Sequence, residues 1–313
     1  MTNKLALRAS ALLLLLLLGL PALAAEPLKM DGKTVRLMTI GNSFSQDATF
    51  YLDDLAKADG NELSLKTANI GGSSMQQHWE KAQLHEKDPE NKAGVYTAGR
   101  GLKEILSDGP HDFVTIQQRS LSSHDLETYR PYASHLQGYV KKYAPNAELI
   151  LHETWAYRVD DPRFAVKAPK AGEPKSQQEM YELLAKSYRT IAKELGVQLI
   201  PVGDAFYAAD TDAKWGYKVD AAFDVKQAKH PLLPDQSHSL HVGRKWSTTD
   251  KAEPKLGMDG HHASVAGRYL GACVWYEKLF QTSCVGNKFT AGLDGDYARF
   301  LQETAHRVVE SAK

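Results

Sequence analysis

Short apolar runs alternate with amphipathic segments along most of this chain. Runs of aliphatic and β-branched residues without helical spacing are typical of buried strands, and they predict strands at 35–40, 62–69, 112–116, 148–152 and 197–202. Apolar residues at helical spacing predict helices at 47–58, 75–84, 96–106, 129–143, 180–195 and about 264–280. Regular alternation of strand and helix predicts an α/β domain, with a mainly parallel sheet covered by helices on both faces.

Two polar, proline-containing segments interrupt the alternation, at 158–175 and 209–258. Irregular segments of this length are uncommon in a compact domain unless they serve binding. We expect them to wall a substrate cleft, with Trp and Tyr rings of 209–258 available to stack on sugars. Surface insertions without a function are the alternative. No linker or internal repeat divides the chain, so 26–313 is expected to be one domain.

The N-terminus has the pattern of a secretory signal peptide. Lys4 and Arg8 precede an apolar run from Ala11 to Leu20, and small residues follow up to Ala25. The run is shorter than the ~20 residues that a membrane-spanning helix needs. We therefore expect residues 1–25 to be removed, no membrane anchor to remain, and the mature protein to be periplasmic or secreted.

Composition narrows the range of partners. Lys plus Arg and Asp plus Glu both number 38, so no general field favours nucleic acid or an anionic membrane. Small neutral or mixed substrates fit this balance better. The two cysteines, Cys273 and Cys284, are either a disulfide or buried thiols, and they are too few for a structural zinc site. The sequence does not predict the oligomeric state.

Ser43 is the candidate nucleophile. It follows Gly41 and Asn42 at the expected carboxyl end of the first strand, the edge at which open α/β sheets bind ligands. A serine needs a base to take its proton, and Asp259 and His262 have a spacing that lets a carboxylate orient an imidazole. As an alternative, Ser43 only caps the helix that follows it, although Ser45 is an equally good cap.

Other histidines compete for the role of base. Asp235 and His238 have the same spacing but lie inside the irregular segment, and His261 is adjacent to His262. A zinc site built from His238, His241, His261 and His262 fits no spacing that places two ligands on one helical face. We therefore favour the serine mechanism and expect no metal and no cofactor.

Three motifs together carry a family resemblance. Gly41–Ser45, the glycine-rich turn Asn69–Ser73 and Asp259–His262 resemble the SGNH (GDSL-like) hydrolases, and more narrowly a bacterial branch that begins with Ile-Gly-Asn-Ser-Phe-Ser. The resemblance implies a flavodoxin-like three-layer α/β/α sandwich with a five-stranded sheet. It also implies ester hydrolysis through an acyl-enzyme, with Ser43 as nucleophile, His262 as base and Asp259 as the orienting carboxylate.

The oxyanion hole of that family uses the serine N–H, a glycine N–H after the second strand and an asparagine side chain after the third. Gly72, or else Gly71, matches the glycine, but Gln117 and Gln118 stand where the asparagine is expected. We expect one glutamine amide to replace it, and Asn42 to brace the loop.

Export and Trp155 after the fourth strand favour a carbohydrate ester, with removal of O-acetyl groups as the leading function. Alternatives are a non-catalytic carbohydrate-binding protein, a lipid esterase or thioesterase, and acyl transfer to a sugar.

Overall fold

Five parallel strands form the central sheet, in the order β2-β1-β3-β4-β5. They span β1 Thr34–Gly41, β2 Glu62–Asn69, β3 Phe113–Ile116, β4 Glu148–His152 and β5 Gln198–Ile200. The computed structural model describes residues 32–96, 99–247 and 253–312, and the expected signal peptide at 1–25 lies outside them. All five predicted strands are present, and this strand order is that of the flavodoxin-like folds. The predicted fold class is therefore confirmed.

β1 lies between β2 and β3 in the sheet. Its residues pair with β2 from Thr34↔Glu62 to Gly41↔Asn69, and with β3 from Leu37↔Phe113 to Ile40↔Ile116. Every residue from Leu37 to Gly41 is buried, because helices cover both sides of the strand. The apolar run is continuous rather than alternating for this reason. At the carboxyl end of the sheet, β1 ends between β2 and β3, so a side chain just after Gly41 has a neighbouring strand on each side.

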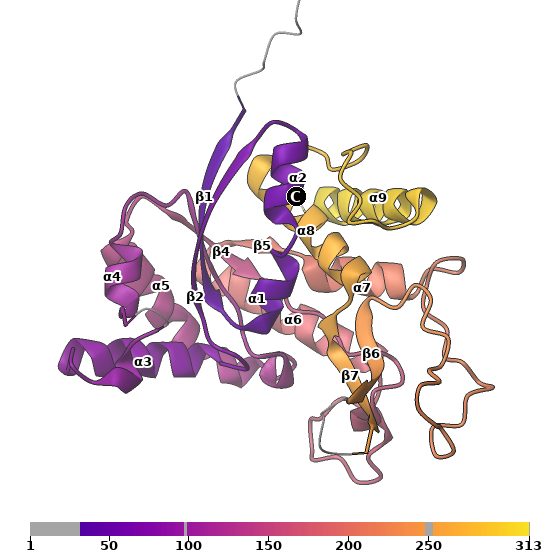
Figure 1. Cartoon of the computed structure of the whole chain (residues 1–313). Coiled ribbons are helices and arrows are strands. Elements are labelled where there is room, and N and C mark those ends of the chain that lie inside the picture. The colour runs from indigo at the N-terminus through magenta and orange to yellow at the C-terminus, as the bar shows by residue number, and fades with distance from the viewer. Residues whose placement is uncertain (1–31, 97–98, 248–252, 313) are drawn as a thin grey trace, which may run out of the picture. The chain divides into compact units, whose positions relative to one another are not determined.

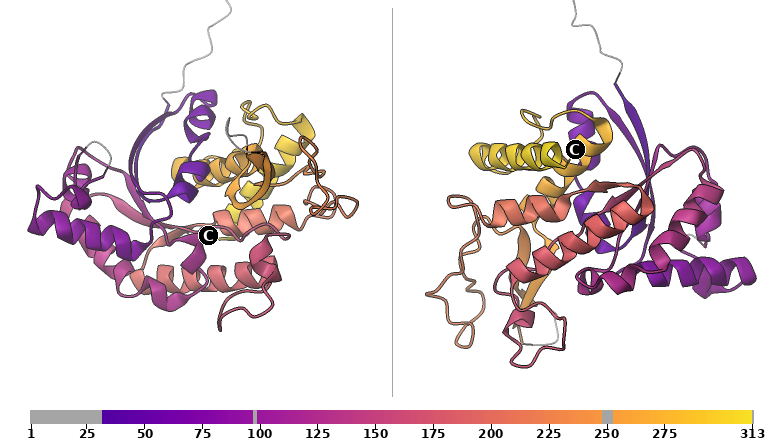
Figure 2. Two further views of the ribbon diagram at one scale, coloured as in Figure 1. Left: turned by 60° about the horizontal axis from the view of Figure 1, so that its bottom comes forward. Right: turned by 180° about the vertical axis from the view of Figure 1, so that it is seen from behind.

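Helices cover both faces of the sheet (Figures 1 and 2). One layer holds α3 Met75–Lys87, α4 Leu102–Leu106, α5 Tyr132–Tyr143 and α6 Gln177–Leu195. The other holds α1 Ser43–Ala48, α2 Leu52–Ala58, α7 Val202–Asp210, α8 Val265–Phe280 and α9 Gly295–Ser311. α8 is almost entirely buried, because it packs against α1, α2, α7 and α9.

Short 3-10 helices occupy several of the connections. They are η1 Lys92–Gly94, η2 Ser120–Ser122, η3 Leu126–Tyr129 and η4 Pro162–Ala165. η2 follows β3 directly, and η4 is the regular part of the segment 158–175. Both segments lie near the carboxyl ends of the strands, which makes them relevant to the site.

α6 shows how local sequence sets the helix ends. The Ser176 side chain accepts a hydrogen bond from the Glu179 N–H at the N-terminus. Gly196 ends the helix with φ 64°, a left-handed conformation that favours glycine. Between these caps, the buried face includes Met180, Leu184 and Ile191, so this predicted helix and its glycine cap are confirmed.

The sequence-based prediction was wrong or incomplete in the second half of the chain. The segment 209–258 is not irregular throughout, because β6 His241–Ser247 pairs with β7 Lys255–Ala263 in an antiparallel hairpin. The helix predicted at 47–58 is interrupted into α1 and α2, and α7 and α9 were not predicted. Residues 32–313 form one compact unit.

Cys273 and Cys284 are both buried as free thiols, so the structure has the second of the two predicted states. Within the described residues, none of the helices combines the length and the hydropathy needed to cross a membrane.

Candidate active site

The turn after β1 presents Ser43 at the start of α1. Asn42 caps this helix, since its side-chain oxygen accepts a hydrogen bond from the Phe44 N–H at 2.9 Å, and its amide donates to the Ser73 carbonyl at 2.9 Å. Neither Ser43 nor Ser45 is the cap, which corrects the capping alternative drawn from the sequence. Asn42 braces the loop, and the Ser43 hydroxyl stays available for other contacts.

Gly41 is required where the strand turns into the helix. A Cβ atom at this position would lie 2.5 Å from Ser45 Oγ and 2.7 Å from Gln117 Oε1. The glycine therefore lets these buried polar groups pack directly beneath the turn that carries Ser43.

Ser43, His262 and Asp259 form a hydrogen-bonded chain. His262 Nε2 lies 3.0 Å from Ser43 Oγ, and His262 Nδ1 lies 3.1 and 3.2 Å from the two carboxylate oxygens of Asp259. The Asp259 carboxylate also accepts from Lys245 Nζ at 3.1 Å. The structure thus brings together the three residues selected from the sequence, although Ser43 and His262 are 219 positions apart in the chain. In this arrangement the imidazole can take a proton from the hydroxyl while the carboxylate fixes its tautomer.

Asp259 and His262 lie on β7, before α8 begins, and an irregularity in the hairpin brings them together. Gly243 pairs with Asp259 and His241 pairs with Ala263, so β7 holds two more residues than β6 across this interval. A bulge of this kind re-aims side chains that would otherwise alternate between faces. The Asp259 carboxylate also accepts from the His262 N–H at 3.2 Å, which stabilises the bend.

Asp47 connects this bend to the helix that carries Ser43. Its carboxylate accepts from the Ala263 N–H at 2.9 Å, and from Arg268 Nε at 2.9 Å. Asp47 is buried one turn after Ser43, so the bond to Ala263 holds the residue next to His262 against α1. No pattern in the sequence had selected Asp47.

The charges of the site affect its titration. Burial alone would raise the pKa of Asp259, but hydrogen bonds from the His262 side chain and backbone and from Lys245 lower it well below the usual range. The hydrogen bond to Asp259 raises the pKa of His262 above 6.5 despite its partial burial. Burial, followed by the charge of His262, lowers the pKa of His261. The two adjacent histidines therefore differ in basicity, and His262 is the stronger base.

The competing histidines do not contact Ser43. His261 Nδ1 lies 3.3 Å from Asp259 Oδ1, but the imidazole that contacts the serine is that of His262. His238 packs against Trp215 and Tyr297. Within the described ranges, one group could hold a metal ion, formed by Asp259, His261 and His262. A metal there would bind the atoms that the hydrogen-bonded chain uses, and the zinc site considered from the sequence is not assembled.

The two glutamines do not have the predicted position. Gln117 is buried, and its amide donates to Asn42 Oδ1 at 2.8 Å while its oxygen accepts from Ser45 Oγ. Gln118 is also buried, and its amide donates to the Thr128 carbonyl at 2.8 Å. Because both side chains are buried and neither lines the pocket at Ser43, the expectation that one of them completes an oxyanion hole is corrected. Gln117 instead supports the Ser43 turn from below.

Trp155 is a core residue rather than a substrate platform. It is fully buried, stacks on Phe206 with 4.4 Å between ring centroids, and packs against Phe44 at 4.3 Å. Its indole N–H donates to the His261 carbonyl at 2.9 Å. Trp155 therefore positions the segment that carries the candidate base, and the predicted contact with a sugar is not available to it.

A pocket of about 490 Å³ opens at Ser43 and His262. Gly71 and Gly72 line it, with Gly72 at φ 66°, where glycine is favoured. The remaining lining includes side chains that sequence reasoning did not select: Arg119, Ser120, Leu121, Tyr157, Arg163 and His261. No described residue of 209–258 lines this pocket, so the expected Trp and Tyr wall is wrong, whereas 158–175 contributes Arg163. Isolated polar residues in loops carry no periodic signal that could have selected them.

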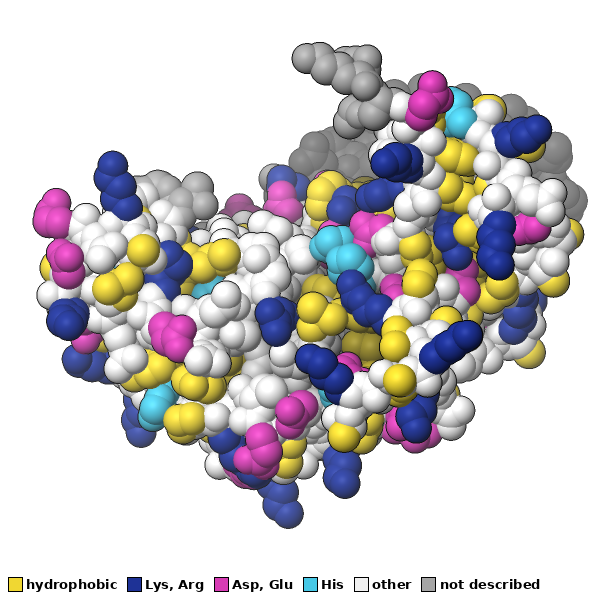
Figure 3. All heavy atoms as spheres, turned by 90° about the horizontal axis from the view of Figure 1, so that it is seen from below, with side chains coloured by type: hydrophobic (Ala, Val, Ile, Leu, Met, Phe, Trp, Pro, Cys, Tyr) yellow, Lys and Arg dark blue, Asp and Glu magenta, His cyan; other side chains and the backbone are white. Residues whose placement is uncertain are grey.

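A second pocket of about 380 Å³ adjoins the first. The two share Leu121, Tyr157 and Arg163, and the second continues along mainly apolar residues that include Phe164, Val166 and Met180. Residues from 158–175 therefore wall both parts of this cleft. Figure 3 views the molecule from this side, with histidine side chains near the middle of the face and basic side chains beside them.

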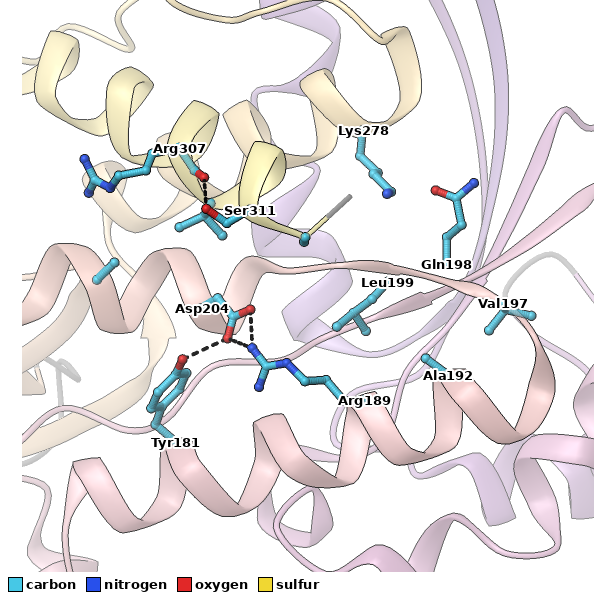
Figure 4. Close-up of a pocket in the computed structure, with 13 residues that line it drawn as sticks. Tyr181, Arg189, Ala192, Val197, Gln198, Leu199, Asp204, Lys278, Arg307 and Ser311 are labelled. Atoms are coloured by element: carbon cyan, nitrogen blue, oxygen red, sulfur yellow. Dashed lines mark hydrogen bonds and ion pairs between the residues drawn. The ribbon is translucent and has the colours of Figure 1, made fainter.

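A larger hollow of about 830 Å³ lies away from the candidate triad, between α6, β5 and α9 (Figure 4). Three of its polar side chains pair with each other, because the Asp204 carboxylate accepts from Tyr181 at 2.9 Å and from Arg189 at 2.7 Å. The residues predicted for the site are all described in the structure, and none of them lines this hollow.

Several solved structures of bacterial proteins are similar to this chain. A DUF4886 family protein from Bacteroides uniformis is 25% identical, with a TM-score of 0.67 over 90% of this chain and 97% of that chain. A putative SGNH hydrolase from Slackia heliotrinireducens is 20% identical, with a TM-score of 0.46 over 78% of this chain and 98% of that one. A putative GDSL-like lipase from Parabacteroides merdae is 15% identical, with a TM-score of 0.45 over 80% and 98% of the two chains.

No curated protein matches this sequence. The model of the family described as "Domain of unknown function (DUF4886)" matches residues 36–223. That range contains Ser43 but ends before Asp259 and His262. Since it covers more than half of the chain, this protein belongs to the DUF4886 family.

Proposed function

We propose that this protein is a serine esterase that removes O-acetyl or similar short acyl groups from carbohydrate outside the cytoplasm. The observation that carries the proposal is the 3.0 Å contact between Ser43 Oγ and His262 Nε2, with Asp259 on the opposite ring nitrogen. A nucleophile, a base and an orienting carboxylate in this order are the parts needed for acyl transfer to a serine.

In the proposed reaction, Ser43 Oγ attacks the ester carbonyl and His262 Nε2 takes its proton. The tetrahedral intermediate then collapses, the bond to the alcohol breaks, and His262 donates the proton to the departing alcohol. Water attacks the acyl-enzyme in the same way, giving its proton to His262, and the free acid leaves as Ser43 regains its hydrogen. The backbone N–H groups of Ser43 and Gly72 are the proposed donors to the oxyanion.

The proposed preference for a sugar ester rests on the lining of the pocket and on the expected signal peptide. His261 lines the pocket beside Ser43 and its side chain is partly exposed, so its imidazole can hydrogen-bond to a sugar hydroxyl. A secreted esterase would meet such polymers outside the cell.

A lipid esterase is the second candidate, because the adjoining apolar pocket could accept a longer acyl chain. A test set of p-nitrophenyl acetate, a long-chain p-nitrophenyl ester and an acetylated xylan separates the two. We expect cleavage of the acetate and release of acetic acid from the xylan. Preference for the long chain would support the lipid esterase and contradict the sugar ester.

The assay needs a variant that keeps the fold. Ser43→Ala removes the nucleophile and should lower ester cleavage more than about 10⁴-fold, with an unchanged melting temperature. Ser45→Ala is not a suitable control, because Ser45 Oγ donates to Gln117 beneath the turn. Ser134→Ala on the exposed surface of α5 is a better one. Full activity in the Ser43→Ala protein would overturn the proposal.

A further inference from the structure

The pocket at Ser43 has a one-sided charge, although the whole chain is balanced. Arg119 and Arg163 line it together with two histidines, and none of the described residues that line it is an aspartate or glutamate. Asp259 lies behind His262 and is bound to Lys245 and both histidines. A substrate in this pocket therefore faces cationic groups rather than carboxylates.

Neither arginine is neutralised by an ion pair within the part of the chain that the structure describes. The Arg119 guanidinium donates from Nη2 to Ser122 Oγ at 3.3 Å, and its buried Nε has no hydrogen-bond partner among the described residues. The Arg163 guanidinium lies 4.5 Å from the centre of the Tyr157 ring. Asp161 is nearby, but its carboxylate accepts from the Arg163 backbone N–H, at 2.9 Å, and it caps η4. Arg119 is partly exposed and Arg163 is exposed, so their remaining guanidinium N–H groups are free to donate to a ligand in the pocket.

Tyr157 connects the two segments that carry these arginines. Its hydroxyl lies 2.9 Å from Ser120 Oγ, in the residue after Arg119, and its ring supports the Arg163 guanidinium. The Tyr157 side chain is almost fully buried, and its ring centroid lies 5.6 Å from that of His261. Tyr157 therefore holds the Arg163 guanidinium directly, and it fixes the backbone next to Arg119 through Ser120. This partly preorganises the two cations beside the histidine pair.

We propose that Arg119 and Arg163 bind a carboxylate of the substrate, so that the ester cleaved at Ser43 belongs to an acidic sugar. This inference rests on the proposed esterase function and names its substrate class. Guanidinium groups match the geometry of a carboxylate and make charge-assisted hydrogen bonds to it. The acyl group would lie at Ser43 and the uronate carboxylate between the arginines.

The test compares two small esters that differ in one charge. 4-Acetoxybenzoate carries a carboxylate that cannot reach its own acetyl group, and methyl 4-acetoxybenzoate is its neutral counterpart. Release of acetate gives kcat/KM for both. We expect the wild-type protein to prefer the charged ester, and Arg119→Gln and Arg163→Gln each to lower kcat/KM for it about 10- to 100-fold. The neutral ester should change less than about 3-fold.

Arg299→Gln is the matched control. Arg299 is exposed on α9, pairs with Glu303 and lies outside the pocket, so both esters should react as in the wild type. High salt should reduce the preference of the wild type for the charged ester, because ions screen the attraction. A loss of equal size on both esters in Arg119→Gln would overturn the inference, since it would place Arg119 at the oxyanion or in a structural role.

A binding measurement separates this inference from the proposed reaction. Calorimetry with the Ser43→Ala protein needs no turnover and compares glucuronate with glucose, and 4-acetoxybenzoate with its methyl ester. We expect the carboxylates to bind at least about 10-fold tighter, and the double variant Arg119→Gln/Arg163→Gln to remove the difference. Equal binding of charged and neutral ligands would overturn the inference even if the protein is an active esterase. Carboxylate binding without ester cleavage would support the inference and contradict the esterase.

Discussion

The turns after β1 and β3 follow neighbouring strands and are both polar, but they differ in how many of their polar residues are buried before one reaches the pocket. After β1, the side chain of Asn42 is buried and Ser43 faces the pocket. After β3, Gln117 and Gln118 are both buried, and the first side chain to reach the pocket is Arg119. Gln117 is hydrogen-bonded to Asn42, so the second turn supports the first from inside. A polar residue at the carboxyl end of a strand can therefore be part of the scaffold as readily as part of the site.

The largest expected effect separates the two adjacent histidines. His262→Ala removes the base that contacts Ser43 and should lower kcat more than about 10⁴-fold. His261→Ala should lower it less than about 10-fold, because His261 contacts Asp259 but not Ser43. Steady-state kinetics on p-nitrophenyl acetate measure both. Equal losses in the two variants would mean that the histidine pair acts as a unit, contrary to the separate roles of His261 and His262.

An intermediate effect tests whether the buried turn after β3 supports Ser43. Gln117→Leu removes the amide that donates to Asn42 Oδ1 and the oxygen that accepts from the buried Ser45 hydroxyl. Leaving a buried donor without its acceptor costs about 1–3 kcal/mol. We expect a lower melting temperature and a kcat about 10-fold lower, since the helix cap beneath Ser43 loosens.

Gln118→Leu is the matched variant for this comparison. It breaks the bonds to Met75, to Thr128 and to the backbone N–H of Arg119, none of which belongs to the Ser43 turn. It should therefore lower the melting temperature to a similar extent while kcat stays within about 3-fold of the wild type. If Gln118→Leu lost kcat and Gln117→Leu did not, the second glutamine would be the one that serves the reaction.

The smallest effect is a shift of the pH profile. His262 accepts a proton only when it is neutral, and Asp259 raises its pKa, so kcat/KM should fall as the pH drops through that raised pKa. Asp259→Asn removes the negative charge, lowers the pKa of His262 and moves the acidic limb to lower pH, while the rate itself also falls. Asp235 has the same spacing to His238 as Asp259 has to His262, so Asp235→Asn is the matched control. It should not move the acidic limb of the pH profile. An acidic limb that stays in place in Asp259→Asn would contradict the pairing of Asp259 with His262.

The strands could be predicted because burial on both sides leaves short, largely apolar runs such as 37–40 and 149–151. Most helices could be predicted because their apolar residues recur at helical spacing. The hairpin β6–β7 could not, because its strands are largely polar and contain glycine, and only pairing between them defines it. Trp155 was misassigned for a related reason. An aromatic residue after a strand has the same one-dimensional pattern whether it faces solvent or packs on Phe206 and Phe44.

The triad candidates could be predicted because their chemistry needs particular residue types at a particular spacing. Asp259 and His262 come together through a bulge in β7 rather than through a helical turn, a local structure that their spacing alone does not reveal. Arg119, Arg163 and Asp47 could not be found in this way. Each acts through a contact with a distant segment, and a lone charged residue in a polar stretch has no local pattern.

Labelling with a fluorophosphonate, followed by mass mapping of the modified residue, tests the central claim most directly, because such probes react with a serine that a neighbouring base activates. We predict a single adduct, located on Ser43, formed by the wild-type protein and lost in folded His262→Ala. A folded wild-type protein that leaves Ser43 unmodified, under conditions in which a known serine hydrolase is labelled completely, would contradict it.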